Sequence, residues 1–387
     1  MSRVGSKCED LRVKNIGSPM YVMLKPVGSR CNLSCRYCYY LDKGSGQVMD
    51  EALLEDFTRQ YIEAQTVPQV LFTWHGGEPL LKPLSFYQRA LELQQKYARG
   101  RQIDNCLQTN GTLLNDEWCR FFHDNHFLIG ISIDGPQALH DAYRNTRQGG
   151  TSWHEVMRGI QLLRQHGVEW NAMATVNASN VEHPQTFYRF FREIGCEFLQ
   201  FTPVVEPDNP DCSITADQWG RFLCAVYDEW VQQDVGRVFV QLFDATLANW
   251  CGVVPGVCSM SSTCGRAVVM EADGTVYSCD HFVRPEHRLG NIRQQPLVEL
   301  LYNERQLRFG QSKQTLLPRQ CRECRWLFAC HGECPKNRLQ NDCYDQPGLN
   351  WLCQGYQQFF AHVAADMDFM KSELAAGRAA ANIMSRK

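Results

Sequence analysis

Three cysteines lie within eight residues of the segment RCNLSCRYCYYL. Cys31, Cys35 and Cys38 have the spacing C-x3-C-x2-C, which is one thiolate short of a closed four-cysteine site. Three thiolates can hold a [4Fe–4S] cluster and leave one iron open, as a catalytic site requires if a small molecule is to bind there. A zinc site completed by a nearby histidine is the alternative that this spacing leaves open.

A second group of cysteines follows a stricter pattern toward the C-terminus. The spacing C-x9-G-x4-C around Gly274 is followed by C-x2-C-x5-C-x3-C and one distant cysteine. With one more cysteine upstream, the group comprises Cys258, Cys264, Cys279, Cys321, Cys324, Cys330, Cys334 and Cys353. Eight thiolates suffice for two fully ligated four-iron clusters, although spacing alone also allows a pair of zinc knuckles.

The composition indicates a cytosolic enzyme. The chain has 387 residues and a net charge of −3, which gives no reason to expect a nucleic-acid or membrane-surface partner. Its start is polar and lacks an apolar signal region, and no apolar run is long enough for a membrane span. Its 19 cysteines should therefore stay reduced, which favours metal binding or redox chemistry over disulfides.

Short β-like runs alternate with amphipathic helices over the first 234 residues or so. The expected strands are Tyr21–Lys25, Val70–Trp74, Asn105–Gln108, Leu128–Ile133, Ala172–Val176 and Phe198–Phe201. Trp153, Val156, Ile160 and Leu163 recur at helical spacing between two of them. This alternation predicts an α/β fold with a parallel sheet, an open, partial (β/α)6 TIM-like barrel. Because chemistry in such barrels collects at the carboxyl ends of the strands, the first cysteine loop is expected there.

The domain boundaries follow from a change of character near residue 250. We expect a leader at 1–20, the barrel at 21–245 and a cysteine-rich, loop-rich domain at 250–355. A C-terminal helix and tail should occupy 356–387, with the helix over Gln354–Ala380 and the terminal NIMSRK as a frayed end.

The second expected strand ends in WHGGEPLL. Gly76 and Gly77 permit close backbone approach to a ligand, and Glu78 offers a carboxylate to an ammonium group. Together with CNLSCRYC, this turn resembles the radical S-adenosylmethionine (radical SAM) superfamily. The resemblance implies that Tyr37 and the GGEP turn contact the cofactor.

Two further segments carry the same resemblance. ISIDGP and HDAYR are similar to the family segments that bind the cofactor through a serine and an arginine, which implies that Ser132 holds the ribose and Arg144 the carboxylate. LQTNG at 107–111 corresponds to another strand end near the cofactor.

The later cysteines resemble the SPASM extension of radical SAM enzymes that modify peptides and proteins. The resemblance implies two auxiliary [4Fe–4S] clusters, three clusters in all. The first would be held by Cys258, Cys264, Cys279 and Cys334. The second would be held by Cys321, Cys324, Cys330 and Cys353.

Longer stretches narrow the resemblance to anaerobic sulfatase-maturating enzymes. They are MYVMLKPVGSRCNLSCRYCYYLDK, FTWHGGEPLL, CDHFVRPEHRLGNI, CHGECPKNR and GLNWLCQGYQQFF. The implied activity is oxidation of an active-site cysteine or serine of a sulfatase to Cα-formylglycine, through Cβ hydrogen abstraction by a 5′-deoxyadenosyl radical. The implied partners are the sulfatase and a low-potential electron donor such as flavodoxin or ferredoxin. One departure is His75, where relatives often carry Gln.

The catalytic base should lie near the electron acceptor, and Asp280 directly follows Cys279. Resemblance to the family motif CDHFV also favours Asp280 as the base, the alternative being a partner that orients the cluster loop. Tyr40 is either a substrate contact or a packing residue. His281 is expected to be structural, Glu271 and Asp273 to form the turn before Gly274, and Cys343 to be no ligand.

Two other functions remain open from the sequence. Another SPASM-type maturase could form a thioether or other crosslink in a ribosomal peptide. A zinc-binding scaffold without catalysis is the lesser alternative.

Overall fold

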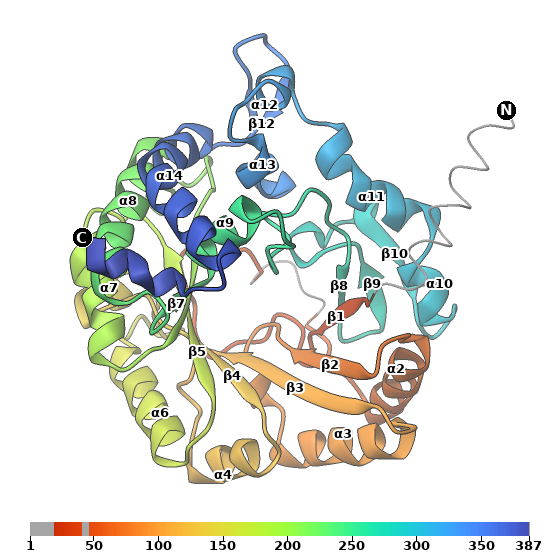
Figure 1. The fold of residues 1–387 in the computed structure, drawn as a ribbon. Helices are drawn as coiled ribbons and strands as arrows, with labels where there is room; N and C mark the ends of the chain where they lie inside the picture. The colour runs from red at the N-terminus through yellow and green to blue at the C-terminus, as the bar shows by residue number, and fades with distance from the viewer. Residues whose placement is uncertain (1–18, 41–45, 387) are drawn as a thin grey trace, which may run out of the picture.

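One large sheet organises the molecule. The computed structural model describes residues 19–40 and 46–386. Its main sheet has the strand order β10-β9-β8-β1-β2-β3-β4-β5-β6-β7, and neighbours from β1 to β7 run parallel. The strands curve into an open barrel with helices on its outer face (Figure 1). The parallel strands are β1 (Tyr21–Leu24), β2 (Gln69–Trp74), β3 (Gln102–Thr109), β4 (Leu128–Ser132), β5 (Trp170–Val176), β6 (Phe198–Pro203) and β7 (Phe239–Val240).

The six strands expected from the sequence are all present, and their ends differ from the expected ones by at most three residues. The seventh, β7, has only two residues, too few to produce a periodic signal. The intervening helices are α2 (Glu51–Ala64), α3 (Leu84–Tyr97), α4 (Asp116–Asp124), α5 (Gln137–Asp141), α6 (Trp153–Gln165), α7 (Pro184–Glu193), α8 (Ala216–Gln233) and α9 (Gln241–Trp250). The partial barrel is therefore confirmed.

The barrel core is built from alternating strand residues and single helix faces. In β2, Val70, Phe72 and Trp74 are buried while the residues between them are more exposed, as a period of two requires. In α6, the predicted apolar face is correct, with Val156 and Ile160 buried against the sheet.

The region after residue 250 continues the barrel sheet. β8 (Ala267–Met270) pairs in parallel with β1, and β9 (Thr275–Tyr277) and β10 (Arg288–Asn291) extend the sheet antiparallel. The sequence reading missed these strands because each has only three or four residues. The pairing of β8 with β1 places the segment that contains Cys279 and Asp280 beside the end of the first barrel strand.

The remaining elements are mostly short and surround the later cysteines. They are η1 (Pro79–Leu81), η2 (Asp280–Phe282), η3 (Pro285–His287), α10 (Leu297–Leu301), α11 (Glu304–Thr315), α12 (Arg319–Arg322), α13 (Leu327–Cys330), η4 (Pro335–Asn337), β11 (Gln340–Asn341) and β12 (Pro347–Leu349). The proposed domain limits stay a prediction, and most of the expected leader lies outside the described residues.

The chain ends with α14 (Cys353–Ala375), which packs along α8 (Figure 1). The prediction of a frayed end was wrong. η5 (Ala380–Arg386) follows α14, Ile383 is buried, and Asn382 donates a hydrogen bond to Glu373 in α14. Two adjacent apolar residues, Ile383 and Met384, give no periodic signal, so the sequence could not reveal this docking.

Among the helices formed by the described residues, none combines the length and apolar character that crossing a membrane would need. The cytosolic location stays a prediction.

Candidate functional site

The first cysteine loop follows β1 and is fixed by the backbone of the segment after α5. Ser34 N–H donates to the Asn145 carbonyl at 2.8 Å, and Arg36 N–H donates to the Tyr143 carbonyl at 2.9 Å. Asn110, in the LQTNG strand end, donates to Cys31 Sγ at 3.7 Å. The loop therefore lies at the carboxyl ends of the first barrel strands, where the sequence placed it.

The three thiols of this loop lie close enough for their charges to interact. Burial, together with the charges of neighbouring groups such as Cys38, raises the pKa of Cys31 to about 11 and that of Cys35 to about 12. Three ionised thiolates this close would be costly without a cation between them, and a bound metal centre removes that cost by holding the thiols deprotonated. These residues thus fit a cluster with three protein ligands.

The eight later cysteines separate into two spatial sets. Around Cys279, burial and the charges of Asp280, Cys258 and Cys264 raise the pKa of its thiol to about 12. Burial likewise raises the pKa of Cys334 well above its usual range, with contributions from Cys279 and Cys258. Cys279 therefore lies near Cys258, Cys264 and Cys334, which together are the first set expected from the resemblance.

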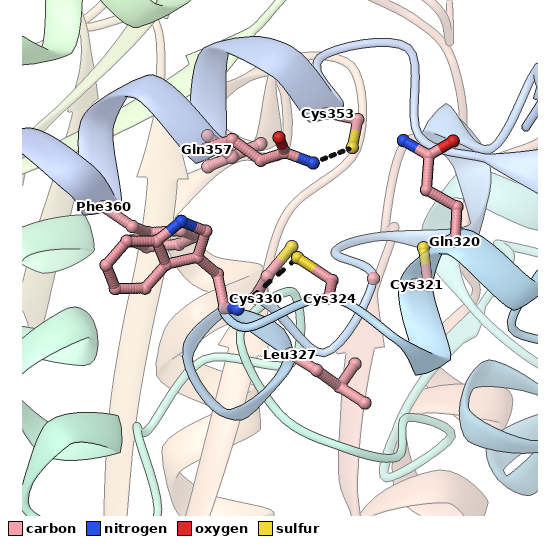
Figure 2. Close-up of a pocket in the computed structure, with 11 residues that line it drawn as sticks. Gln320, Cys321, Cys324, Leu327, Cys330, Cys353, Gln357 and Phe360 are labelled. Atoms are coloured by element: carbon pink, nitrogen blue, oxygen red, sulfur yellow. Dashed lines mark hydrogen bonds between the residues drawn. The ribbon is translucent and has the colours of Figure 1, made fainter. Parts of the chain in front are cut away.

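The second set lines one cavity beneath the start of α14. Figure 2 shows Cys321, Cys324, Cys330 and Cys353 around this cavity, with Gln357 beside Cys353. Gln357 Nε2 donates to Cys353 Sγ at 3.4 Å, and the Trp326 backbone N–H donates to Cys324 Sγ at 3.4 Å. Sulfur atoms that face each other and accept N–H donors fit an iron–sulfur cluster, whose potential depends on such bonds.

The GGEP turn packs against the backbone that leads into the first cysteine loop. Gly77 N–H donates to the Gly28 carbonyl and Glu78 N–H to the Arg30 carbonyl, both at 2.8 Å. Gly76 has a φ of +112°, which glycine adopts without strain. The glycine backbone therefore packs closely against the protein's own backbone at Gly28 and Arg30. A contact between these glycines and the cofactor stays a prediction.

Alanine at position 77 should damage this packing. A Cβ atom there would lie 1.9 Å from the Arg30 carbonyl oxygen, a backbone atom that cannot move without displacing the loop before Cys31. We expect Gly77→Ala to cost about 1–3 kcal/mol in stability and to weaken binding of S-adenosylmethionine. Thermal unfolding and equilibrium dialysis measure the two effects.

Gly150→Ala is the matched control, since its Cβ would meet only the side chain of Thr146, at 3.1 Å. Equal stability and equal cofactor affinity of Gly77→Ala and the control would contradict this account.

Glu78 is fully buried and joins two strand ends. Its carboxylate accepts hydrogen bonds from the Leu80 N–H at 2.9 Å, from Thr109 Oγ1 at 2.8 Å and from the Asn110 N–H at 2.8 Å. Burial nevertheless raises its pKa to about 7. A carboxylate has about four acceptor positions, so three protein donors leave room for one ammonium contact. That contact stays a prediction, and the structure adds a bracing role between β2 and β3.

Arg144 is held by an aspartate that the sequence reading did not single out. Its Nε lies 3.0 Å from Asp134 Oδ2, and Asp134 is completely buried. The Tyr37 hydroxyl donates to the same oxygen, and the Thr175 N–H donates to Asp134 Oδ1 at 2.8 Å. Since a guanidinium has five N–H donors, Arg144 can keep this pair and still bind a second carboxylate.

Ser132 ends β4, and its hydroxyl accepts a hydrogen bond from Gln108 Nε2 at 2.9 Å. Gln108 belongs to LQTNG, so Ser132 and the LQTNG segment share one edge of the sheet. Tyr37, Ser132 and Arg144 therefore all lie at the carboxyl edge expected of them, and their contacts with the cofactor stay predictions.

Asp280 lies between the first cysteine loop and the first auxiliary cysteine set. It follows Cys279 directly, and its Oδ2 accepts a hydrogen bond from Tyr39, the residue after Cys38. Its Oδ1 pairs with Lys25, which is completely buried at the end of β1. Burial works to raise the pKa of Asp280, but Lys25, His75 and His281 together outweigh burial and hold the pKa below the usual range. Asp280 is therefore ionised at neutral pH.

His75 lies close enough to Asp280 and Lys25 to interact electrostatically with both. Burial lowers the pKa of His75 to about 4, so the ring is neutral at pH 7. Its Nδ1 accepts a hydrogen bond from the Gly76 N–H at 2.8 Å, which leaves the proton on Nε2. This position, where the family pattern often has Gln, thus presents a neutral N–H donor.

Tyr40 is a packing residue in this structure. It is buried, its hydroxyl donates to Glu271 Oε2 at 2.5 Å, and Lys25 Nζ lies 3.2 Å from its ring centroid. The turn predicted for Glu271 and Asp273 is confirmed, since the Gly274 N–H donates to the Glu271 carbonyl at 2.9 Å.

Several of the described cysteines outside the three sets are buried. Cys119, Cys196 and Cys212 are buried, and Cys224 is partly buried among apolar residues. Cys106 is also partly buried, and its thiol donates to Thr73 Oγ1 at 3.3 Å. Cys343 is exposed beside the second set, and Cys8 lies outside the described residues. That Cys343 is no ligand stays a prediction.

Two family models match this chain. The Radical SAM superfamily model matches residues 26–191, and the SPASM iron-sulfur cluster-binding domain model matches residues 258–325. A serine-type anaerobic sulfatase-maturating enzyme from Bacteroides thetaiotaomicron is 57% identical, over 95% of this chain and 94% of its own length. The chain belongs to the anaerobic sulfatase-maturating enzyme family.

More distant family members agree with this assignment. A cysteine-type anaerobic sulfatase-maturating enzyme from Clostridium perfringens is 33% identical, over 89% of this chain and 96% of its own length. The solved structure of native anSMEcpe with bound AdoMet and Cp18Cys peptide superposes with a TM-score of 0.85 and 30% identity, covering 92% of this chain and 99% of that chain. The present chain is therefore a radical SAM enzyme that uses S-adenosylmethionine and iron–sulfur clusters. This finding excludes the alternative of a zinc-binding scaffold without catalysis.

Three residues that matter in this enzyme's site escaped the sequence reading, namely Lys25, Tyr39 and Asp134. Each lies inside a motif quoted for its resemblance, within one residue or a few of a predicted site residue. Their partners are remote in sequence, because Tyr39 and Asp280 are 241 positions apart and Tyr37 and Asp134 are 97 apart. Without the fold, nothing marks these side chains as paired.

Proposed function

We propose that this enzyme oxidises an active-site serine of a sulfatase to Cα-formylglycine without oxygen. The choice of serine is supported by the relatives, since the serine-type enzyme is 57% identical and the cysteine-type enzyme only 33%. The reaction removes two hydrogens from the serine side chain, one as a hydrogen atom from Cβ and one as the hydroxyl proton. One electron leaves with that proton, so the product is an aldehyde.

The proposed cofactor sites use the three cysteine sets. Cys31, Cys35 and Cys38 would hold the cluster that binds S-adenosylmethionine, and each auxiliary set would hold a further [4Fe–4S] cluster able to accept an electron. Bound and reduced, the cofactor supplies the radical that takes the Cβ hydrogen. Arg144 would orient the carboxylate of S-adenosylmethionine, while Ser132, Glu78 and Tyr37 would complete the binding site. A low-potential donor such as flavodoxin or ferredoxin would supply the electron for each cleavage.

The position of Asp280 is the observation that carries this proposal. Asp280 is adjacent to Cys279 of the first auxiliary set and hydrogen-bonded to Tyr39 beside Cys38. A substrate between the two sites would therefore have a base and an electron acceptor on the same side. The low pKa of Asp280 does not prevent this role, because a serine radical that loses its electron becomes a strong acid and an ionised carboxylate suffices to accept its proton.

A peptide crosslinking enzyme is the second candidate that the sequence left open. Streptococcus suis SuiB bound to S-adenosylmethionine superposes with a TM-score of 0.63 at 14% identity, a likeness that shows the fold alone. No contact of the described residues favours crosslinking over formylglycine formation.

The deciding experiment is anaerobic incubation with S-adenosylmethionine, a reductant and a sulfatase-motif peptide carrying Ser. Mass spectrometry should show an aldehyde and an equal amount of 5′-deoxyadenosine. The same peptide with Ala at the target position is the control, and the Cys version tests the serine preference. A crosslinked product, or an aldehyde formed from the Cys peptide alone, would contradict the proposal.

A further inference from the structure

A five-residue segment, CHGEC, links the two auxiliary cysteine sets. Cys330, at the end of α13, lines the cavity of the second set, whereas Cys334 neighbours the cysteines of the first. The intervening residues His331, Gly332 and Glu333 are the shortest covalent connection between the two sites. The conformation of this link therefore determines how the two sets lie relative to each other.

The link has an unusual backbone. His331, Gly332 and Glu333 have φ values of 49°, 72° and 52°, so three consecutive residues are left-handed. Only glycine adopts this conformation without steric cost, which means that His331 and Glu333 must be held in place by other contacts.

Arg338 supplies those contacts. Its Nε donates to the Gly332 carbonyl at 3.0 Å, and one terminal nitrogen donates to the His331 carbonyl at 3.2 Å. Its other terminal nitrogen donates to the Lys313 carbonyl at 2.7 Å, which ties the link to α11. A guanidinium can satisfy several carbonyls at once because its donors lie in a rigid plane.

Arg338 also places a permanent positive charge between the two sets. Its guanidinium donates to the carbonyls of His331 and Gly332, which lie between Cys330 of the second set and Cys334 of the first. The other buried charges nearby are Lys313, whose Nζ donates to the carbonyls of Cys258 and Ser259, and Glu333, which accepts from Asn337 and Asn350. Lys313 thus belongs to the first set, and Arg338 acts on both.

We propose that Arg338 is a positioning residue for electron transfer between the auxiliary clusters, because it fixes the left-handed link and its charge raises the reduction potential of both. The proposal rests on the proposed ligation of the two cysteine sets. The physical reason is that reduction adds negative charge, which a nearby buried cation stabilises strongly at low dielectric. Removing the cation should make both clusters harder to reduce.

The test is a redox titration, followed by electron paramagnetic resonance, of the anaerobically reconstituted enzyme. Arg338→Gln keeps an amide donor and loses the charge. We expect the reduction potentials of both auxiliary clusters to fall by about 59 mV, which is a tenfold change in the equilibrium constant for a one-electron reduction. Arg338→Lys should restore the potentials. It lacks the planar fork, so the magnetic interaction between the two reduced clusters should still differ from wild type.

Two further variants sharpen the test. Lys313→Met should lower only the couple of the first set. Arg319→Met removes an exposed arginine paired with Glu323, and its potentials should equal those of wild type because solvent screens that charge.

Wild-type reduction potentials in an Arg338→Gln enzyme with full iron content would overturn the proposal. Loss of iron from both Arg338 variants would also overturn it, because that result would indicate a purely structural role for Arg338. If the wild-type enzyme itself holds no auxiliary cluster, the cofactor assignment under the proposed function fails instead, so the two failures are distinguishable.

Discussion

Asp280→Asn should retain full iron content and should still cleave S-adenosylmethionine, yet lose formylglycine formation by a factor of about 10²–10⁴, the usual contribution of a positioned acid or base. The physical reason is that an amide cannot accept the substrate hydroxyl proton, whereas the three cysteines proposed to hold the cofactor's cluster are unchanged. Iron analysis, 5′-deoxyadenosine release and peptide aldehyde are measured on the same anaerobic sample.

Stability must be separated from chemistry in this variant, because the substitution leaves the buried Lys25 without its ionised partner. Breaking one side of a buried ion pair typically costs about 3–5 kcal/mol. The double variant Lys25→Met with Asp280→Asn removes both charges, so it should recover most of the stability without recovering activity.

Asp273→Asn is the matched control for Asp280. Asp273 Oδ1 accepts a hydrogen bond from the Thr275 N–H at 2.8 Å in the turn before Gly274, and asparagine keeps that acceptor. The control should be fully active. Normal aldehyde yield from Asp280→Asn would remove Asp280 from the role of base.

Cys35→Ala should abolish the release of 5′-deoxyadenosine and reduce the iron content by about one third, from about twelve to about eight atoms per chain, since two of three four-iron clusters would remain. The expected loss is complete because one missing thiolate leaves only two protein ligands in the loop. Iron analysis and chromatography of the nucleoside products measure the two quantities.

Cys224→Ala provides the control, because Cys224 lies in α8 among apolar neighbours and in none of the three sets. It should keep all of its iron and its cleavage activity. A Cys35→Ala enzyme that still releases 5′-deoxyadenosine at the wild-type rate would disprove the assignment of the first cysteine loop.

The sequence was informative where a signal is local. The spacing of Cys31, Cys35 and Cys38 and the alternation of strands and helices each depend on residues close together in the chain, so the barrel and the cysteine loop could be predicted from them. The hydrophobic pattern did not predict the short strands β7, β8, β9 and β10, because two to four residues give no measurable period. Resemblance to family motifs, and not spacing, divided the eight later cysteines into two sets.

By itself, the sequence determined the inventory of chemical groups, namely the three-cysteine loop, the eight later cysteines and an aspartate next to Cys279. Only the tertiary structure decided which groups meet. The pairing of β8 with β1 brings Asp280 close to Lys25 and Tyr39. The left-handed segment after Cys330 places Cys334 near the cysteines of the first set. The physical reason is that charge pairs and shared ligands act over a few ångströms of space, whereas Tyr39 and Asp280 are 241 positions apart in the chain and Cys279 and Cys334 are 55 apart.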